Sequence, residues 1–331
     1  MPKVVELPST TGGVEQIGSA FVYVGDCLES LRELPEESVH CCVTSPPYWG
    51  LRDYGHEKQL GCEDSPEEYL FKMVEVFREV HRVLREDGTL WLNLGDSYAN
   101  SGTPSPDDGE YQGLKPKDLI GIPWRMAFAL RADGWYLRQD IIWHKPKINP
   151  ESVKDRCSKA HEYIFLLSKS ARYFYDAEAV KEPFADDRMG NPGKYKWKYG
   201  EGTDKGKGET SLLKSDGMVH GWNTDGTATG RNRRTVWTIA PTPYKGAHFA
   251  TFPPALIEPC IKAGCPVGGV VLDPFGGSGT TGRVASDLGR KSILCELNPE
   301  YIELIRKRMT EPAKPASKKT NRNSNLALED E

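Results

Sequence analysis

The chain has no excess of positive charge, and its cysteines do not form the patterns typical of metal sites or disulfide frameworks. The 43 lysine and arginine residues are offset by 47 aspartate and glutamate residues, which gives a net charge of −4. Such a chain has no overall basic field, so any nucleic-acid binding must use a local cluster of basic residues. The eight cysteines include no C-x-x-C pair. We expect them to be reduced and mostly structural, without a bound metal.

Long apolar segments and internal repeats are also missing. No run approaches the roughly 20 residues that a membrane-spanning helix needs. The N-terminal segment does not resemble a signal peptide, so we expect a cytoplasmic protein that does not use a membrane. The chain has 331 residues, of which 38% are hydrophobic. This is enough for one large core, or for one core and a smaller lobe.

Apolar runs alternate with helical patterns along most of the chain, which predicts a three-layer α/β fold. Strand-like runs are predicted at 20–26, 39–44, 89–94, 136–144, 162–167, 235–239, 270–272 and 292–295. Helices are predicted at 27–34, 65–87, 118–131, 254–262, 283–288 and 299–309. The helix after Ser65 has the clearest start, because a capping serine is followed by proline in the first turn.

The segment Ser45-Pro46-Pro47-Tyr48 directly follows the strand-like run Val39–Thr44. Two consecutive prolines at the end of a buried strand leave rigid backbone carbonyls that point away from the sheet. An aromatic ring follows at once. Such a segment can hold a flat group that carries an amine, because carbonyl oxygens accept its N–H bonds and the ring covers its face.

A second motif lies near the C-terminus, where the apolar run 270–272 leads into a glycine-rich turn. Gly277, Gly279 and Gly282 satisfy the G-x-G-x-x-G spacing of dinucleotide sites, in which glycine permits a tight turn and close approach of the backbone to a ligand. The next apolar run ends in Glu296, and an acidic side chain at such a strand end can bind ribose hydroxyls. The glycine spacing alone is compatible with an NAD site.

The two motifs together resemble those of the DNA amino-methyltransferases, which methylate the exocyclic nitrogen of cytosine or adenine. Asp273-Pro274-Phe275, in front of the glycines, is similar to the S-adenosylmethionine motif of that family and argues against NAD. The catalytic motif comes first, as in the permuted beta class, and the resemblance covers roughly residues 20–310. It implies a Rossmann-like α/β fold with a mostly parallel sheet and helices on both faces. The carboxyl ends of its strands would bring both motifs into one crevice.

The resemblance also implies roles for the catalytic motif. The Ser45 hydroxyl and the Pro46 carbonyl would accept the two N–H bonds of the target amine, with Pro47 as the second rigid residue. Tyr48 would stack on a base flipped out of the duplex. Within the family, serine at the first position goes mostly with cytosine N4 and aspartate or asparagine with adenine N6. Ser45 therefore favours cytosine N4. The alternatives are adenine N6 methylation, a methyltransferase that acts on RNA or on a protein amide, and a non-catalytic relative.

By the same resemblance, several residues are assigned to the cofactor S-adenosylmethionine. Asp273 would contact its methionine end, Glu296 the ribose hydroxyls and Asp26 the adenine amine, with helix capping as the alternative for Asp26. His248 and Phe252 belong to a segment similar to the family's cofactor-adjacent motif, and packing is the alternative for His248. The full set is Asp26, His248, Phe252, Asp273, Phe275, Gly277, Gly279, Thr280 and Glu296.

Residues 184–234 differ in composition from the rest of the chain, with many glycine, basic and aromatic residues and almost no aliphatic periodicity. A loop of this length without a function is uncommon. The resemblance implies a target-recognition insert, because the family carries its target-recognition region at the corresponding position; a disordered surface loop is the alternative. The insert would separate a catalytic half at 19–183 from a cofactor-binding half of the same domain at 235–310. Residues 1–18 are predicted to be a flexible arm and 311–331 a disordered tail.

Basic and aromatic side chains together suit phosphate contacts and base stacking. The resemblance implies that the partner is double-stranded DNA. Lys145 and Arg156 lie in a stretch similar to a family loop near DNA, and a structural wedge is the alternative for Trp49. The residues predicted to contact DNA are Trp49, Lys145, Arg156, Lys194, Lys196, Arg231, Arg233 and Arg234. The resemblance further implies a bacterial or phage-encoded enzyme. It leaves open a homodimer and a cognate restriction endonuclease.

Overall fold

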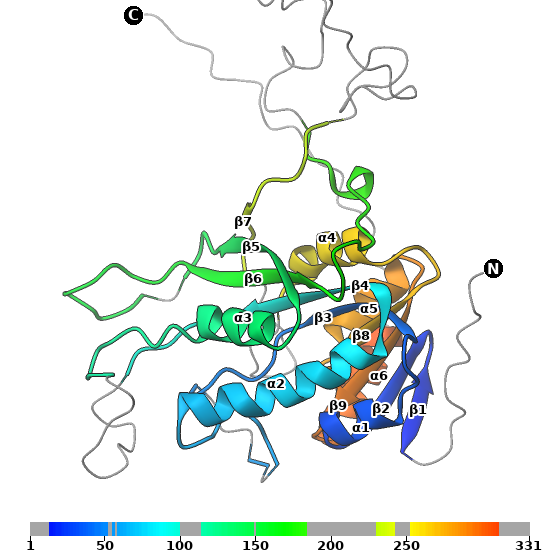
Figure 1. Cartoon of the computed structure of the whole chain (residues 1–331), viewed down its shortest axis with the longest axis horizontal. Coiled ribbons are helices and arrows are strands. Elements are labelled where there is room, and N and C mark those ends of the chain that lie inside the picture. The colour runs from blue at the N-terminus through cyan, green and yellow to red at the C-terminus, as the bar shows by residue number, and fades with distance from the viewer. Residues whose placement is uncertain are drawn as a thin grey trace, which may run out of the picture.

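The computed structural model describes residues 13–51, 55–56, 58–99, 114–148, 150–183, 230–241 and 252–310. Within these residues the strands form one nine-stranded sheet, in the order β1-β2-β9-β8-β3-β4-β6-β5-β7 (Figure 1). The strands are β1 (Val14–Ile17), β2 (Ala20–Val24), β3 (Val39–Thr44), β4 (Leu84–Leu94), β5 (Tyr136–His144), β6 (His161–Ser168), β7 (Val236–Thr238), β8 (Val270–Asp273) and β9 (Lys291–Glu296). The helices are α1 (Cys27–Glu33), α2 (Pro66–Val83), α3 (Ile122–Ala132), α4 (Pro254–Gly264), α5 (Thr280–Asp287) and α6 (Glu300–Thr310), with a short 3₁₀ helix η1 (Glu178–Val180).

The neighbouring strands β2, β9, β8, β3 and β4 run parallel to one another, so their carboxyl ends lie at one edge of the sheet. Strand β6 is antiparallel to both β4 and β5. Leu94 is therefore opposite Tyr163, and His144 is opposite His161. This register brings the start of β6 and the end of β5 to the edge where the catalytic and cofactor motifs lie. The predicted Rossmann-like α/β fold is confirmed.

Helices cover both faces of the sheet, which makes the three predicted layers (Figure 1). Helices α1, α2 and α3 pack in succession on one face, where Tyr69, Met73 and Phe77 of α2 are fully buried. Helices α4, α5 and α6 cover the other face, where Ile261 and Ile305 are fully buried. No helix among the described residues combines the length and the apolar character that crossing a membrane requires.

The boundaries of α2 agree with the prediction at one end only. Ser65 caps the helix, since its hydroxyl accepts a hydrogen bond of 3.1 Å from the backbone N–H of Glu68. The predicted end near Gly88 is wrong, because Leu84 takes up an extended conformation and begins β4, where it pairs with Val39 of β3. Helix α3 also begins later than predicted. The carboxylate of Asp96 accepts hydrogen bonds from the backbone N–H groups at its start.

The predicted flexible arm at 1–18 is wrong for residues 14–17. These residues form β1, which pairs antiparallel with β2 through a turn at Gly18, where φ is +62°. The strand reads Val-Glu-Gln-Ile, with two polar residues in succession, so the sequence shows no alternating pattern here. Residues 1–12, the tail at 311–331 and most of the predicted insert lie outside the described residues, so the predictions for them are untested.

Candidate active site

The catalytic motif begins directly after β3, between the ends of β8 and β4. The hydroxyl of Tyr69, from the buried face of α2, donates a hydrogen bond of 2.8 Å to the carbonyl of Pro47. This bond fixes the direction of the rigid segment. The ring of Tyr48 lies against Gly95, where an added Cβ would come within 2.6 Å of the ring. Glycine at the end of β4 therefore makes room for the aromatic side chain of the motif.

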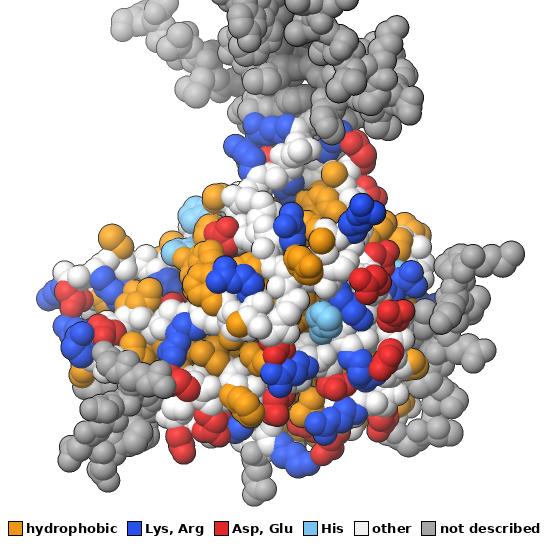
Figure 2. All heavy atoms as spheres, viewed as in Figure 1, with side chains coloured by type: hydrophobic (Ala, Val, Ile, Leu, Met, Phe, Trp, Pro, Cys, Tyr) orange, Lys and Arg blue, Asp and Glu red, His pale blue; other side chains and the backbone are white. Residues whose placement is uncertain are grey.

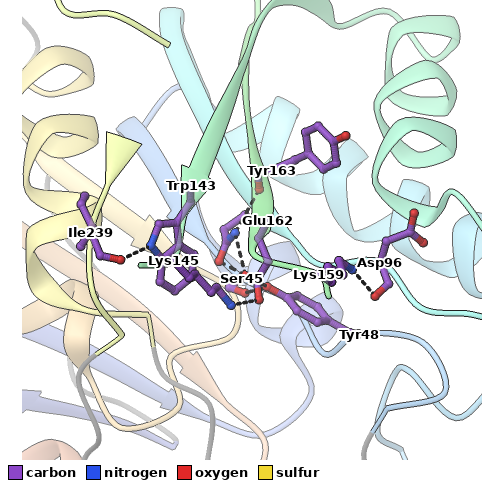
Figure 3. A network of polar contacts seen from close by, with 10 residues as sticks. Ser45, Tyr48, Asp96, Trp143, Lys145, Lys159, Glu162, Tyr163 and Ile239 are labelled. Carbon is purple, nitrogen blue, oxygen red and sulfur yellow. Dashed lines mark hydrogen bonds and ion pairs between the residues drawn. The ribbon is translucent and has the colours of Figure 1, made fainter. Parts of the chain in front are cut away.

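The phenol of Tyr48 is the centre of a polar network, shown in Figure 3. It donates a hydrogen bond of 2.9 Å to Oε2 of Glu162, at the start of β6, and lies 3.3 Å from Oδ1 of Asn93 in β4. The hydroxyl of Ser45 donates to the phenol oxygen at 3.3 Å. The ammonium group of Lys145 forms an ion pair with the carboxylate of Glu162. Burial, together with this carboxylate, raises the pKa of Tyr48 well above its ordinary value, so the phenol stays protonated.

Asn93 and Glu162 were not predicted as site residues. Asn93 interrupts an otherwise apolar buried run in β4, and a buried polar side chain is a signal that the sequence does contain. Glu162 gives no comparable signal, because its partner Tyr48 is 114 positions away. Lys145 was predicted to contact DNA. The structure brings it into this network instead, with its ammonium 4.2 Å from the centre of the Trp143 ring, and leaves a DNA contact untested.

Asp273, at the end of β8, is buried among neutral donors. Its Oδ1 accepts hydrogen bonds from the hydroxyl of Thr44 at 2.6 Å and from the backbone N–H of Phe275 at 3.1 Å. Its Oδ2 accepts a bond of 2.6 Å from the hydroxyl of Thr281 in α5. Burial raises the pKa of Asp273 to about 6, although these bonds act in the opposite direction. The carboxylate thus joins the catalytic strand β3 to the glycine-rich turn.

Glu296, at the end of β9, holds the same turn from the other side. Its two carboxylate oxygens accept hydrogen bonds of 2.7 Å from the N–H of Gly277 and 2.8 Å from the N–H of Asn298. Burial is the largest cause that raises the pKa of Glu296 to about 7. Gly277 and Gly279 have φ values of +51° and +78°, which other residues rarely adopt. The turn therefore needs both its glycines and its acidic anchor.

The other predicted cofactor residues occupy varied surroundings. Asp26 caps α1, accepting hydrogen bonds of 2.9 and 3.0 Å from backbone N–H groups, which supports the alternative interpretation of this residue. Phe275 is partly buried against the core, and Phe252 packs beside α4 on the opposite face. The hydroxyl of Thr280 accepts a hydrogen bond from Arg308 of α6. His248 lies outside the described residues.

Two predicted DNA contacts have partners within the protein. Trp49 is only 6% exposed, and its indole N–H donates to the carbonyl of Glu63 at 2.9 Å. The structure therefore supports the structural wedge for Trp49, and its predicted DNA contact stays untested. Arg156 forms an ion pair of 2.6 Å with Glu151 and covers the ring of Tyr98 at 4.0 Å. It remains partly exposed, so a DNA contact by Arg156 stays a prediction.

The two ends of the predicted insert meet at Glu182. The backbones of Glu182 and Arg231 exchange two hydrogen bonds of 2.9 Å, and the Glu182 carboxylate pairs with Arg231 and Arg234 at 3.4 and 3.0 Å. Arg233 covers the ring of Trp237 at 4.5 Å. Lys194 and Lys196 lie outside the described residues. On the face shown in Figure 2, basic and acidic side chains are mixed rather than separated, in agreement with the small net charge.

The architecture and both motifs correspond to a known family, since a family model described as DNA methylase matches residues 39–307. The chain belongs to this family. The Type II methyltransferase M.SmaI of Serratia marcescens is 46% identical over 304 residues, covering 88% of this chain and 91% of the relative. M.XycI of Xanthomonas campestris pv. cyanopsidis is 45% identical over 330 residues, covering 93% and 96%. The protein is thus a DNA amino-methyltransferase of the restriction–modification type.

Solved structures agree with this assignment. The PvuII DNA methyltransferase, named as cytosine-N4-specific, superposes with a TM-score of 0.60 at 21% identity, covering 90% of this chain and 88% of that one, and shows the fold. The structure of the Thermus thermophilus protein TTHA0409 was determined in complex with S-adenosyl-L-methionine. It superposes with a TM-score of 0.54 at 26% identity, covering 87% and 93%. The methyltransferase uses S-adenosyl-L-methionine as its cofactor.

The glycine-rich turn of the methyltransferase fits this cofactor. The hydroxyl of Ser278 is buried and has no hydrogen-bond partner among the described residues. A Cβ added to Gly277 would meet nothing closer than 3.9 Å, whereas one added to Gly279 would lie 3.2 Å from Ile305. The turn therefore packs against α6 at Gly279 and is open at Gly277. The hydroxyl of Ser278, between these two glycines, is available for a ligand. Such a surface suits a ligand with amine, carboxylate and hydroxyl groups.

Proposed function

We propose that this methyltransferase transfers a methyl group to the exocyclic N4 of cytosine in duplex DNA, after the base has been flipped out of the helix. The proposal rests chiefly on Ser45, a neutral hydroxyl at the first position of the catalytic motif, beside the ring of Tyr48. Base flipping follows because neither side chain could reach a base inside the stack. Both residues lie at the edge of the sheet where the glycine-rich turn also lies.

In this reaction, these residues must make the exocyclic amine of cytosine nucleophilic. The lone pair of the cytosine amine is delocalised into the ring, so the amine reacts poorly. Two acceptors, the Ser45 hydroxyl and the Pro46 carbonyl, would hold its two hydrogens and favour a tetrahedral nitrogen. S-adenosyl-L-methionine supplies an electrophilic methyl group when bound. The protein contributes position, since Thr44 of the catalytic strand is tied directly to Asp273 of the cofactor turn.

A covalent route through cysteine is disfavoured at this site. Cys41 and Cys42 precede the motif in β3, and both side chains are fully buried. Burial raises the pKa of each thiol well above its ordinary value, so neither is a thiolate at neutral pH. Methylation of a ring carbon needs such a nucleophile, whereas methylation of an amine does not. This supports direct transfer.

The remaining assignments belong to the same proposal. Asp273, Glu296 and the turn from Phe275 to Thr280 would surround the cofactor, with Asp26 at its adenine end and Phe252 beside it. The insert at 184–234 would recognise the target sequence, with the arginines that flank Glu182 at its base. Adenine N6 remains the second candidate, because the same pocket could hold either amine and the two specificities occur in one family.

Product analysis tests the proposal directly. The purified protein is incubated with labelled S-adenosyl-L-methionine and unmethylated duplex DNA, and the DNA is digested to nucleosides for mass spectrometry. N4-methylcytosine is the expected product. N6-methyladenine would overturn the assignment of the base and leave the family and the cofactor in place. Label in RNA and none in DNA would overturn the substrate. Ser45→Ala serves as the control, because it should form little product while still binding the cofactor.

A further inference from the structure

A serine in the first position of the motif raises a problem of hydrogen direction. A hydroxyl carries one hydrogen and two lone pairs, so it can donate or accept. Ser45 can accept an N–H bond from the target amine only if its own hydrogen points elsewhere. An ionised aspartate in this position would have no hydrogen and therefore no such problem. The surroundings of Ser45 must settle which way its hydrogen points.

The network around Tyr48 settles that direction. An ionised carboxylate can only accept, so the hydrogen of the Tyr48 phenol points to Glu162, its closest partner at 2.9 Å. The amide of Asn93 donates to the carbonyl of Tyr163 at 3.0 Å and to Glu162 at 3.3 Å, which leaves its oxygen facing the phenol as a second acceptor. The phenol hydrogen is thus committed, and only lone pairs of the phenol oxygen face Ser45. Ser45 must be the donor in the 3.3 Å contact.

Lys145 is the last member of this hydrogen-bonded series of side chains, as Figure 3 shows. Its ammonium group pairs with the Glu162 oxygen that Tyr48 does not use, so each oxygen of this carboxylate accepts from a different donor. The ammonium lies against the ring of Trp143, whose indole N–H is fixed by a 2.8 Å bond to the carbonyl of Ile239. Both charged side chains are partly buried, so water competes little with the pair.

We propose that the Lys145–Glu162 ion pair, acting through the phenol of Tyr48, turns the hydroxyl hydrogen of Ser45 away from the target amine and makes Ser45 a hydrogen-bond acceptor. Glu162 and Lys145 are positioning residues in this scheme, since they act on the amine only through Ser45. The inference rests on the proposed direct transfer to an amine. It gives a neutral serine the accepting character that a carboxylate has by itself.

A double-mutant cycle between Ser45→Ala and Glu162→Gln tests the proposal. Glutamine keeps the shape of Glu162 but can donate to Tyr48. This would reverse the direction of the hydrogen bonds that link Ser45, Tyr48 and Glu162. We expect each single variant to lower kcat about tenfold or more, as for loss of a charge-assisted hydrogen bond. The double variant should be no slower than Ser45→Ala alone, because Glu162 acts through the serine. The proposal would be overturned if the effects of the two substitutions on kcat multiply, or if the Glu162→Gln enzyme has a normal kcat.

Tyr48→Phe tests the same series of hydrogen bonds if the Glu162→Gln variant does not fold. It removes only the phenol oxygen and keeps the stacking ring, so kcat should fall while KM for DNA changes little. In the Ser45→Ala background it should have no further effect, and an undiminished effect there would contradict the chain. Glu258→Gln is the matched control, since it removes a Lys–Glu ion pair on α4 away from the site. Cofactor affinity reports folding in every variant.

Failure of the proposed function can be told apart from failure of this inference. If the wild-type enzyme does not methylate an exocyclic amine of DNA, the proposed function itself is wrong. If it does, and Ser45→Ala retains full kcat, the role of Ser45 as acceptor is wrong. If Ser45→Ala lowers kcat and Glu162→Gln lowers it further by the same factor in the Ser45→Ala background, only the positioning by Glu162 is wrong. Each outcome is read from kcat and the identity of the methylated base.

Discussion

Two carboxylates at the same edge of the sheet, Glu162 at the start of β6 and Asp273 at the end of β8, are held in opposite ways. Glu162 has a cation beside it, because Lys145 forms an ion pair with its carboxylate. The described partners of Asp273 are two hydroxyls and one backbone N–H, all of them neutral. Burial raises the pKa of Asp273 to about 6 and that of its neighbour Glu296 to about 7.

The difference separates two tasks within one crevice. A carboxylate with a paired cation accepts charge-assisted hydrogen bonds and can orient hydroxyls through a fixed chain of such bonds, which suits the catalytic end. Carboxylates held by neutral donors tie the backbone of a turn together, and their charge depends on pH near neutrality. The catalytic end should therefore govern turnover, and the cofactor end should govern binding and stability. Three substitutions and one change of pH test this division.

The largest effect is expected for Asp273→Ala at the cofactor end. The change removes the carboxylate that accepts from the hydroxyls of Thr44 and Thr281 and from the N–H of Phe275, and among the described residues only Thr281 keeps another acceptor, the carbonyl of Val43 at 3.5 Å. At roughly 1–3 kcal/mol for each unsatisfied group, we expect the free energy of unfolding to fall by about 4 kcal/mol. Cofactor affinity should fall with it. Chemical denaturation and calorimetric titration with S-adenosyl-L-methionine measure the two quantities.

Asp273→Asn is the matched control for this prediction. The amide is nearly isosteric, and a threonine hydroxyl can accept from its NH₂ group where it previously donated. Most of the lost stability should therefore return in the asparagine variant. If alanine and asparagine were equally destabilising, the negative charge would be the important feature, and the account based on neutral donors would be wrong.

Tyr48→Ala should give the next largest effect, and on turnover rather than on cofactor binding. The change removes the stacking ring, a contribution of about 1–3 kcal/mol per base, together with the phenol that links Ser45 to Glu162. We expect kcat/KM for DNA to fall about 100-fold, with the dissociation constant of the cofactor changed less than about twofold. Steady-state kinetics and titration separate the two. A large loss of cofactor affinity would show that the motif does not lie on the catalytic side.

The contrast between the two ends also explains what could be predicted from the sequence. The strand Val39–Thr44 and the cap at Ser65 were predicted correctly, because apolar runs and caps are local patterns. The glycine-rich turn was found because positive φ angles and tight turns demand glycine at fixed spacing. Glu162 was missed, because an acid at the start of a strand becomes a site residue only when antiparallel pairing carries it to the edge where Tyr48 lies.

Boundaries failed where tertiary pairing competed with local propensity. Residues 84–88 continue the pattern of α2, yet Leu84 pairs with Val39, and the chain becomes a strand. Asp26 and Asp96 both end strands at the crevice, and both accept backbone hydrogen bonds at a helix start. An acidic residue at the end of a strand therefore indicates that it lies at the crevice. It does not by itself indicate whether the residue binds a ligand or caps a helix.

A smaller effect is expected from pH, and it belongs to the cofactor end. The pKa of Glu296 in the folded protein is about 7, above its ordinary value of 4.5, so the folded state keeps a proton that the unfolded state loses. The resulting stability is complete below pH 4.5 and is lost as the pH rises to 7. Relative to Glu296→Gln, which does not titrate, the wild type should lose on the order of 2 kcal/mol between pH 5 and pH 8.

Denaturation curves at several pH values measure this difference. Glu258→Gln is the control for the loss of one glutamate elsewhere, because Glu258 lies on α4 and pairs with Lys262. A constant difference between wild type and Glu296→Gln over this range would contradict the raised pKa. Asp273 is present in every variant, and its charge contributes to the raised pKa of Glu296, so the difference between wild type and Glu296→Gln includes this coupling.

The smallest effect is expected for Asp26→Asn, which tests how far the cofactor end extends. Oδ1 of Asp26 accepts both capping hydrogen bonds, from Leu28 and Glu29, and asparagine caps a helix nearly as well. Stability should therefore change by less than about 0.5 kcal/mol. If the other oxygen accepts the adenine amine, replacing it with NH₂ should weaken cofactor binding about fivefold. Asp26→Ala should lower both quantities, since it removes the cap as well. Unchanged affinity in the asparagine variant would make Asp26 a helix cap alone and confine the cofactor contacts to the turn between β8 and β9.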